Sequence, residues 1–166
     1  MSNNYAGKFV SAETAVKAVQ PGDWVDYGFG AGFPELLDRA LAARRDELTD
    51  VKIRGGLVIR PRIEVVESDP EQKAFSYYSW HGDYERKLQT RGLCKFMPMM
   101  LRSLPEMYRH HIRVDVAFVP VSRPDADGCC GLGISNYAWR TIFENARTVI
   151  FEINERLPRL QGVDGS

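Results

Sequence analysis

The chain has 166 residues, and its 22 Lys and Arg residues are balanced by 22 Asp and Glu residues. This length fits one ordinary domain that can bury a core without disulfides or a metal. Because the charge is balanced and no apolar stretch approaches the length of a membrane span, we expect neither nucleic acid nor a membrane as a partner.

The cysteines point to a reducing compartment. Their number is odd, and two of the three are adjacent, which makes a poor disulfide framework. The three are Cys94, Cys129 and Cys130. The first eight residues are polar and lack the apolar stretch of a signal peptide. Together these features predict a cytoplasmic protein.

Short β-rich runs alternate with helical patterns along the chain. Ser11 can cap a first helix, Pro21–Asp23 forms a turn, and Pro34 stands where helices often begin. Glycines and aspartates mark a long loop over Ser122–Gly133. We predict strands at 24–28, 51–59, 74–80, 93–97, 114–121 and 148–153, and helices at 11–19, 34–41, 83–89, 98–108 and 135–146.

Single residues carry the finer expectations for these helices. Asp83 and Ser135 should cap the third and fifth helices, and Gly92 fits the end of the third. Pro105 should break or kink the fourth helix. The second helix should have one apolar face, formed by Leu36, Leu37, Ala40 and Leu41.

This alternation predicts an α/β domain in which a mostly parallel sheet carries helices on both faces. Ligands in such domains meet the loops that follow the carboxyl ends of the strands. Candidate site residues are therefore sought in those loops.

Several patterns occur together, in a fixed order, along roughly the whole chain. They are Ser11–Val19, Pro21–Asp23, Gly28–Pro34, Met97–Pro98 with Pro105 and Tyr108, Asp115–Asp125, Gly131–Ser135 and Val149–Asn154. No single pattern is diagnostic, but the ordered set resembles the acetyl-CoA hydrolase and CoA-transferase family. That family includes butyryl- and 4-hydroxybutyrate-CoA transferases.

The resemblance implies a CoA-transferase/isomerase-like domain of three layers within a longer, two-domain protein. Residues 1–166 would be the amino-terminal domain, and CoA would bind mostly to the second domain. The family moves CoA between a short-chain acyl-CoA and an acid such as acetate, through a glutamyl-CoA thioester. A carboxylate nucleophile suits this exchange because each step is nearly isoenergetic.

The family's nucleophilic glutamate lies in the second domain, so the resemblance implies no catalytic residue in this chain. We expect the chain to be inactive alone and to need that domain as its partner. Coenzyme A would be a substrate, not a cofactor, and the complete protein is expected to be a homo-oligomer.

The loop Gly28–Pro34 is the first candidate binding element. Its glycines could let backbone N–H groups approach an anion or a thioester oxyanion, or could simply form a tight turn. Its spacing is neither a dinucleotide fingerprint nor a P-loop. The resemblance implies an acyl-pocket wall, formed by Gly30, Ala31, Gly32, Phe33 and Pro34.

Further candidates follow other strands. Met97 and Pro98 could line the acyl pocket, although methionines also pack ordinary helices. His81 could donate a hydrogen bond to a substrate carboxylate or satisfy only its own loop. Gly133 and Ser135 could belong to a second loop facing the cleft, or Ser135 could only cap a helix.

No metal site is expected. Adjacent His110 and His111 side chains point in different directions, and no partner stands at ligand spacing. Cys129–Cys130 also lacks the spacing of a zinc site.

Two other readings stay open. The same fold could serve as a stand-alone module that binds a phosphorylated sugar or an acyl metabolite. It could also expose an apolar interaction face, formed by Phe29, Phe33, Phe96 and Met97.

Overall fold

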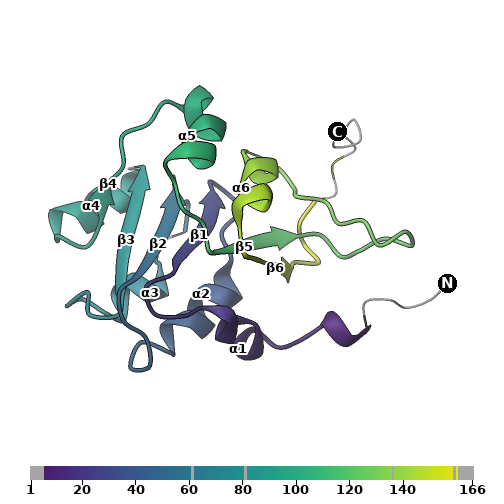
Figure 1. Cartoon of the computed structure of the whole chain (residues 1–166), viewed down its shortest axis with the longest axis horizontal. Coiled ribbons are helices and arrows are strands. Elements are labelled where there is room, and N and C mark those ends of the chain that lie inside the picture. Colours follow the sequence, from purple (N-terminus) through teal and green to yellow (C-terminus); the bar gives the residue numbers. More distant parts are fainter. Residues whose placement is uncertain (1–5, 61, 81, 136, 159, 161–166) are drawn as a thin grey trace.

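The computed structural model describes residues 6–60, 62–80, 82–135, 137–158 and 160. Within them, one sheet holds six parallel strands in the order β4-β3-β2-β1-β5-β6 (Figure 1). The strands are β1 (Trp24–Phe29), β2 (Val51–Gly56), β3 (Phe75–Trp80), β4 (Lys95–Phe96), β5 (Val116–Val121) and β6 (Thr148–Ile153). The predicted parallel sheet is confirmed.

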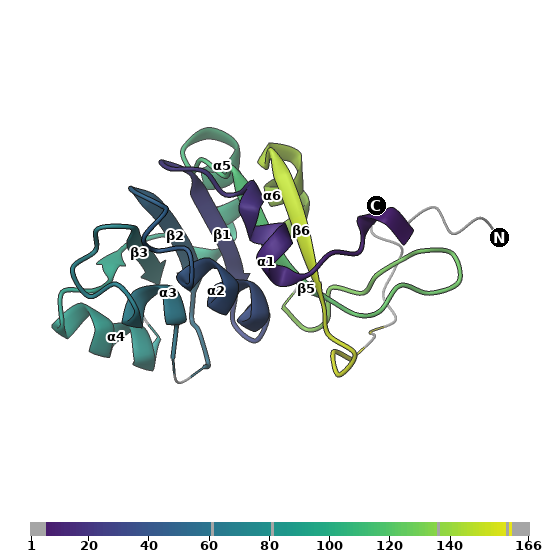
Figure 2. The same ribbon diagram turned by 90° about the horizontal axis from the view of Figure 1, so that it is seen from below.

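Helices cover both faces of the sheet, as predicted. Figure 2 shows α1 to α4 along one face, with α5 and α6 on the far side. The helices are α1 (Ala12–Ala15), α2 (Glu35–Ala42), α3 (Glu64–Glu67), α4 (Asp83–Thr90), α5 (Leu104–His110) and α6 (Trp139–Asn145). Short 3-10 turns occupy Ala6–Lys8, Val16–Ala18 and Leu101–Ser103.

Two hydrophobic cores result from this arrangement. Leu41 of α2 and Leu88 of α4 pack with Phe118 in the first core. Tyr108 of α5 and Ile142 of α6 pack with the second, on the opposite face. All six residues of β5 are buried, because this strand has a helix layer on each side.

The sheet has a topological switch point between β1 and β5, because the strand order changes direction there. The two strands pair only at Val25 with Val116 and at Asp26 with Ala117, whereas β5 and β6 pair along six residues. Figure 1 shows β5 and β6 turning away from β1. Ligands of open α/β sheets bind at such a point, beyond the carboxyl ends of the strands.

Several local predictions hold. Ser11 caps α1 by accepting a hydrogen bond from the Thr14 N–H at 3.3 Å. Gly92 follows α4 with a positive φ of 74°. In α2, Leu37, Ala40 and Leu41 are buried, but Leu36 is 55% exposed, so its place on the apolar face was wrong.

Other helix starts were predicted wrongly. Asp83 is the first residue of α4, and the capping position belongs to Gly82. The segment from Pro98 is not helical until the 3-10 turn at Leu101. The predicted break near Pro105 is confirmed, because that turn ends at Ser103 and α5 begins at Leu104, with Pro105 in its first turn. Ser135 caps no helix, because α6 begins at Trp139 after a left-handed residue.

The limits of several strands also differ from the prediction, as at β4, which spans only Lys95–Phe96. The strand predicted to reach Ile59 ends at Gly56, and Ile59 is 71% exposed. The short helix α3 was not predicted. None of the helices described is long and apolar enough to cross a membrane.

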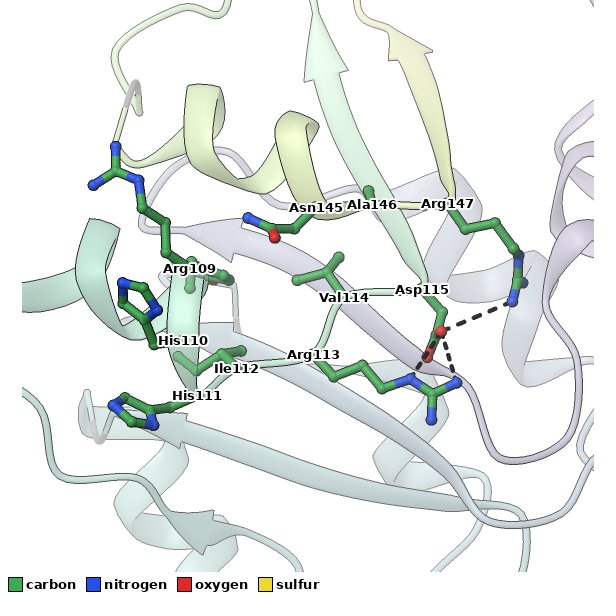
Figure 3. A pocket seen from close by; sticks show the side chains of 11 residues that line it. Arg109, His110, His111, Ile112, Arg113, Val114, Asp115, Asn145, Ala146 and Arg147 are labelled. Carbon is green, nitrogen blue, oxygen red and sulfur yellow. Dashed lines mark hydrogen bonds and ion pairs between the residues drawn. The ribbon is translucent and has the colours of Figure 1, made fainter.

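The amino edge of the sheet carries a hollow of about 480 Å³ between the ends of α5 and α6 (Figure 3). Arg113 and Arg147 both reach Asp115 there, as the dashed lines show. The hollow also adjoins the carboxyl ends of two helices, which disfavour anions. It lies at the edge opposite the expected ligand side.

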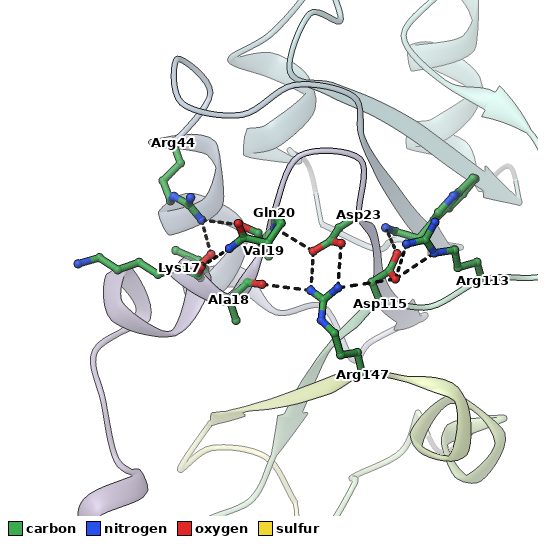
Figure 4. A network of polar contacts seen from close by, with 11 residues as sticks. Lys17, Ala18, Val19, Gln20, Asp23, Arg44, Arg113, Asp115 and Arg147 are labelled. Carbon is green, nitrogen blue, oxygen red and sulfur yellow. Dashed lines mark hydrogen bonds and ion pairs between the residues drawn. The ribbon is translucent and has the colours of Figure 1, made fainter.

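A polar network beside this hollow joins the starts of β1, β5 and β6 (Figure 4). Arg147 donates two hydrogen bonds to Asp23, at 2.8 and 3.1 Å, and Asp115 accepts one from the Trp24 N–H at 2.8 Å. Burial raises the pKa of Asp23, but hydrogen bonds from Arg147 and the Gln20 N–H outweigh burial, so this pKa lies below its usual value.

We predict that Arg147→Met lowers the free energy of unfolding by about 1–2 kcal/mol at pH 7, because it removes the main partner of a buried carboxylate. The depressed pKa of Asp23 means that this loss shrinks as the pH falls below about 4. Urea denaturation measures both effects. Arg140→Met, which removes an exposed pair with Glu144, should change stability by less than about 0.5 kcal/mol. Equal changes in the free energy of unfolding from the two substitutions would contradict a stabilising role of the pairing between Arg147 and Asp23.

Candidate functional site

The candidate site lies at the carboxyl edge of the sheet, where β1 and β5 diverge. A register shift between Asp26 and Phe29 bends the end of β1, and Gly28 has a positive φ of 70°. The indole of Trp139 packs on Gly28 so closely that an added Cβ would lie 2.4 Å from its Cζ2 atom. Glycine is therefore required here, and Trp139 fixes the point where the chain leaves β1.

Two predicted loops meet next to this point. A Cβ at Gly30 would lie 3.6 Å from Ser135 Oγ, and a Cβ at Gly32 would lie 3.1 Å from Ser135 Cβ. Trp139 holds the second loop by donating its indole N–H to the Ser135 carbonyl at 2.9 Å. The fold thus brings two glycines of the predicted site next to Ser135, which is about a hundred positions further along the chain.

The remaining residues of these loops face different surroundings. Ala31 is partly exposed, whereas Phe33 and Pro34 are buried. Phe33 packs edge-on against Tyr27, with 5.6 Å between ring centroids. Gly133 packs against Leu157, since a Cβ there would lie 2.9 Å from its Cγ atom.

The other candidates lie toward the outer edge of the sheet. Met97 donates its N–H to the Ser79 carbonyl at 3.1 Å and is partly buried, and Pro98 is exposed. His81 lies outside the described residues. Of the proposed apolar interaction face, Phe96 is 53% exposed, but Phe33 is only 6% exposed, so that face does not include Phe33.

Sequence reasoning missed an aromatic cluster at the same edge. Phe29 packs edge-on against Trp80 at 5.2 Å and approaches Tyr137 at 6.0 Å, measured between ring centroids. A Cβ at Gly56 would lie 2.6 Å from the Phe29 ring. All three rings are partly exposed. The signal in the sequence was an aromatic residue at the end of each of two strands, β1 and β3, which lie on either side of β2.

A buried ion pair supports the end of β1. Asp26 and Arg54 are 2% and 4% exposed, and Asp26 Oδ2 accepts hydrogen bonds from Arg54 at 2.7 Å and from the Tyr108 hydroxyl at 2.5 Å. Asp26 Oδ1 accepts the Gly28 N–H at 2.8 Å. The same carboxylate thus neutralises a buried guanidinium and orders the bend before the glycine loop.

Glu85 holds the loops that follow β2 and β3. Its side chain is fully buried and accepts the N–H groups of Val58 at 2.7 Å and Gly82 at 3.1 Å, together with the Ser79 hydroxyl at 3.1 Å. These partners occupy both carboxylate oxygens, so Glu85 is a structural group and not an available nucleophile.

Asp38 of α2 performs a similar task for α3. It accepts the Glu64 N–H at 2.7 Å, the Val65 N–H at 3.3 Å and the Tyr27 hydroxyl at 3.2 Å. Burial raises the pKa of Asp38 to about 7, although the two N–H donors and Tyr27 oppose the rise. Asp38 therefore titrates near neutral pH.

No group of three or more His, Cys, Asp and Glu residues that could hold a metal occurs in the described part of the chain.

A family model of the acetyl-CoA hydrolase/transferase N-terminal domain matches residues 1–166. The chain belongs to this family. Curated relatives of this acetyl-CoA hydrolase/transferase N-terminal domain include the butyryl-CoA:acetate CoA-transferase of Anaerostipes caccae, which is 39% identical over 95% of this chain and 36% of the relative. A probable butyrate:acetyl-CoA coenzyme A-transferase of Syntrophomonas wolfei is 38% identical over 95% of this chain and 35% of the relative.

Solved structures agree with the fold of this acetyl-CoA hydrolase/transferase domain. The crystal structure of RipA from Yersinia pestis superposes with a TM-score of 0.80 and 26% identity, over 92% of this chain and 38% of that one. A 4-hydroxybutyrate CoA-transferase from Porphyromonas gingivalis shares the fold, with a TM-score of 0.62 and 23% identity over 93% of this chain and 35% of that one. The chain spans about a third of the length of the curated relatives that it matches.

We predict that Gly28→Ala lowers the free energy of unfolding by about 1–3 kcal/mol more than Gly22→Ala does, because the methyl group of Ala at position 28 would overlap Trp139. The comparison is matched, since Gly22 also has a positive φ, of 82°, but has no atom within 4 Å of an added Cβ. Gly22→Ala should therefore cost only the backbone strain, about 1–2 kcal/mol. Similar losses in the two variants, measured by chemical denaturation, would contradict the tight approach of Trp139.

We also predict that Asp38→Asn changes the pH dependence of stability. The pKa of Asp38 is raised from 3.8 to about 7 in the folded state, so the folded protein binds this proton more tightly than the unfolded chain. The contribution of Asp38 to stability is full below about pH 4 and is lost as the pH rises through 7.

Unfolding free energies of the native chain and the Asp38→Asn variant are compared by urea denaturation at pH 5 and pH 7. Between these values, the native chain should lose about 1–2 kcal/mol more than the variant. Equal losses of unfolding free energy in the two proteins between pH 5 and pH 7 would show that the buried carboxyl of Asp38 does not titrate in this range.

Proposed function

We propose that this chain is the first domain of a CoA-transferase, in which it forms one wall of the cleft where a short acyl group changes its CoA partner. The observation that carries the proposal is the meeting of Gly30 and Gly32 with Ser135 at the switch point of the sheet. The transferase names of the relatives support the same reaction class. They do not favour a stand-alone metabolite-binding module.

The role of the glycine loop in this proposal is to bring the Ala31 and Phe33 N–H groups close to the oxygen of the reacting acyl carbonyl, because the N–H groups of Gly30 and Gly32 already donate to the carbonyls of Gly56 and Phe29. Gly30 and Gly32 have no side chain, so an acyl thioester could approach the main chain between Gly30 and Pro34. Backbone N–H groups that are held in place can stabilise a developing oxyanion without reorganising. Met97, Pro98, His81, Gly133 and Ser135 complete the proposed binding surface.

The reaction we propose proceeds in two exchanges at a glutamate of the second domain. The glutamate carboxylate attacks the thioester carbonyl, CoA leaves as a thiolate, and an acyl-glutamyl anhydride forms. The thiolate then attacks the glutamyl carbonyl, which releases the first acid and leaves a glutamyl-CoA thioester. The acceptor acid, such as acetate, reverses these two steps.

No carboxylate of this chain is assigned as that nucleophile. Glu85 is fully buried and accepts backbone N–H groups through both of its oxygens, and Glu152 accepts two N–H groups through one oxygen at the start of α2. We therefore propose a second domain as the obligatory partner, with CoA as substrate and no further cofactor. We also propose that the complete protein is a homo-oligomer located in the cytoplasm.

The direct test joins this chain to the part of the Anaerostipes caccae relative that lies outside the matched region. We expect the joined polypeptide to exchange butyryl groups between butyryl-CoA and acetate, measured by liquid chromatography of the CoA esters. The 166-residue chain alone should show no exchange above background.

Gly32→Val in the joined polypeptide should lower kcat/KM at least about tenfold, because a branched side chain would fill the space against Ser135. Gly7→Val is the control, since an added Cβ at Gly7 has no atom within 4 Å. A folded joined polypeptide without exchange, or full exchange by the chain alone, would contradict the proposal.

A further inference from the structure

The loop Gly30–Pro34 ends where α2 begins, and that beginning is held by a residue far away in the sequence. Glu152 of β6 accepts the N–H groups of Leu36 and Leu37, each at 3.0 Å, through the same carboxylate oxygen. The donors and the acceptor are separated by more than a hundred residues. Glu152 thus connects the last strand of the sheet to the exit of the glycine loop.

The first N–H groups of a helix have no partner within the helix, and they attract negative charge. No side-chain cap bonds to α2 from Pro34, which stands at its capping position. Glu152 supplies the missing acceptor from outside the helix. Burial raises the pKa of Glu152, and the Leu37 and Leu36 N–H groups counter that rise.

The near end of the loop is fixed as well. Gly28 donates its N–H to Asp26 at 2.8 Å, and Gly30 donates to the Gly56 carbonyl at 2.8 Å. Between these bonds and the donors to Glu152 lie the loop residues that we propose to face the acyl group, followed by Glu35. The carboxylate of Glu152 also faces Glu35 and Tyr27, and neither offers it a positive charge.

We propose that Glu152 is a positioning residue, which sets the conformation of the loop Gly30–Pro34 by anchoring the first turn of α2. Its assignment to acyl transfer rests on the function proposed above, but the anchoring itself can be tested without that function. Glu152 contacts no reacting atom in the proposed site. It affects the reaction only through the conformation of the loop Gly30–Pro34.

Amide hydrogen exchange, followed residue by residue by NMR, tests the anchoring in the 166-residue chain. In Glu152→Leu and Glu152→Ala, the Leu36 and Leu37 amides should exchange at least about tenfold faster, because their acceptor is gone. The amide of Ile53 in the core should change by less than about twofold. Glu152→Gln keeps an acceptor oxygen and should stay within about threefold of the native rates.

Glu155→Leu serves as the matched control, because Glu155 is an exposed glutamate two residues after β6 and pairs with Arg123. It should leave the Leu36 and Leu37 amides unchanged. Unchanged exchange in both Glu152→Leu and Glu152→Ala would overturn the proposal. Equal acceleration at Ile53, or loss of the fold in both variants, would also overturn it, because Glu152 would then act on global stability.

The joined polypeptide tests whether the anchoring of α2 by Glu152 contributes to acyl transfer. Glu152→Leu should lower kcat at least about tenfold and change KM for acetate by less than about threefold, and Glu152→Gln should restore most of kcat. Native kcat in Glu152→Leu would overturn the catalytic part of the proposal. If the native joined polypeptide shows no transfer, the proposed function fails, whereas hydrogen exchange still decides the anchoring.

Discussion

The carboxyl edge of this sheet depends on one recurring interaction, a buried or half-buried carboxylate that accepts backbone N–H groups of a distant loop. Backbone donors removed from water need an acceptor, and an ionised carboxylate is a strong one. Four residues do this work, each for a different segment. They are Asp26 for the bend after β1, Asp38 for the start of α3, Glu85 for the loops after β2 and β3, and Glu152 for the start of α2.

This arrangement explains why the glycine loop can be irregular and still have one conformation. The loop has no regular hydrogen-bond ladder of its own, yet Asp26 and Glu152 hold its two ends. Trp139 adds a steric limit at Gly28, where no larger residue fits. If this surface receives a reacting acyl group, as we propose, such restriction would favour catalysis, since catalysis depends on donors that are already in place.

The same interactions separate structural carboxylates from catalytic ones. A nucleophilic carboxylate must be accessible and must keep an oxygen available for attack. Glu85 meets neither condition, because it is fully buried and both of its carboxylate oxygens accept hydrogen bonds. A second domain that brings its own glutamate to this edge is the arrangement that we propose.

The sequence predicted the sheet and most of its strands, because alternating apolar runs and helical patterns are local signals. It failed where tertiary contacts override a local cap. Asp83 looked like the cap of α4, but Glu85 reaches back to Gly82 instead. The helix that was predicted to begin at Ser135 begins at Trp139 instead. The Trp139 indole lies against Gly28 and donates a hydrogen bond to the Ser135 carbonyl.

The site was only partly predictable for the same reason. Its glycines could be read from their position after a strand, and Ser135 from its place in a second glycine-rich segment. Nothing local could show that Glu152 bonds to Leu36 and Leu37 across more than a hundred residues. Nor could the sequence show that Phe29 contacts Trp80 and Tyr137, because that contact depends on the order of the strands.

A crystal structure of the joined polypeptide with bound butyryl-CoA would show whether the glycine loop receives the acyl group. We expect the oxygen of the thioester carbonyl to lie within hydrogen-bond distance of the Ala31 or Phe33 N–H, next to Ser135. A thioester bound away from this loop, for example in the hollow beside Arg113 at the amino edge, would contradict this expectation.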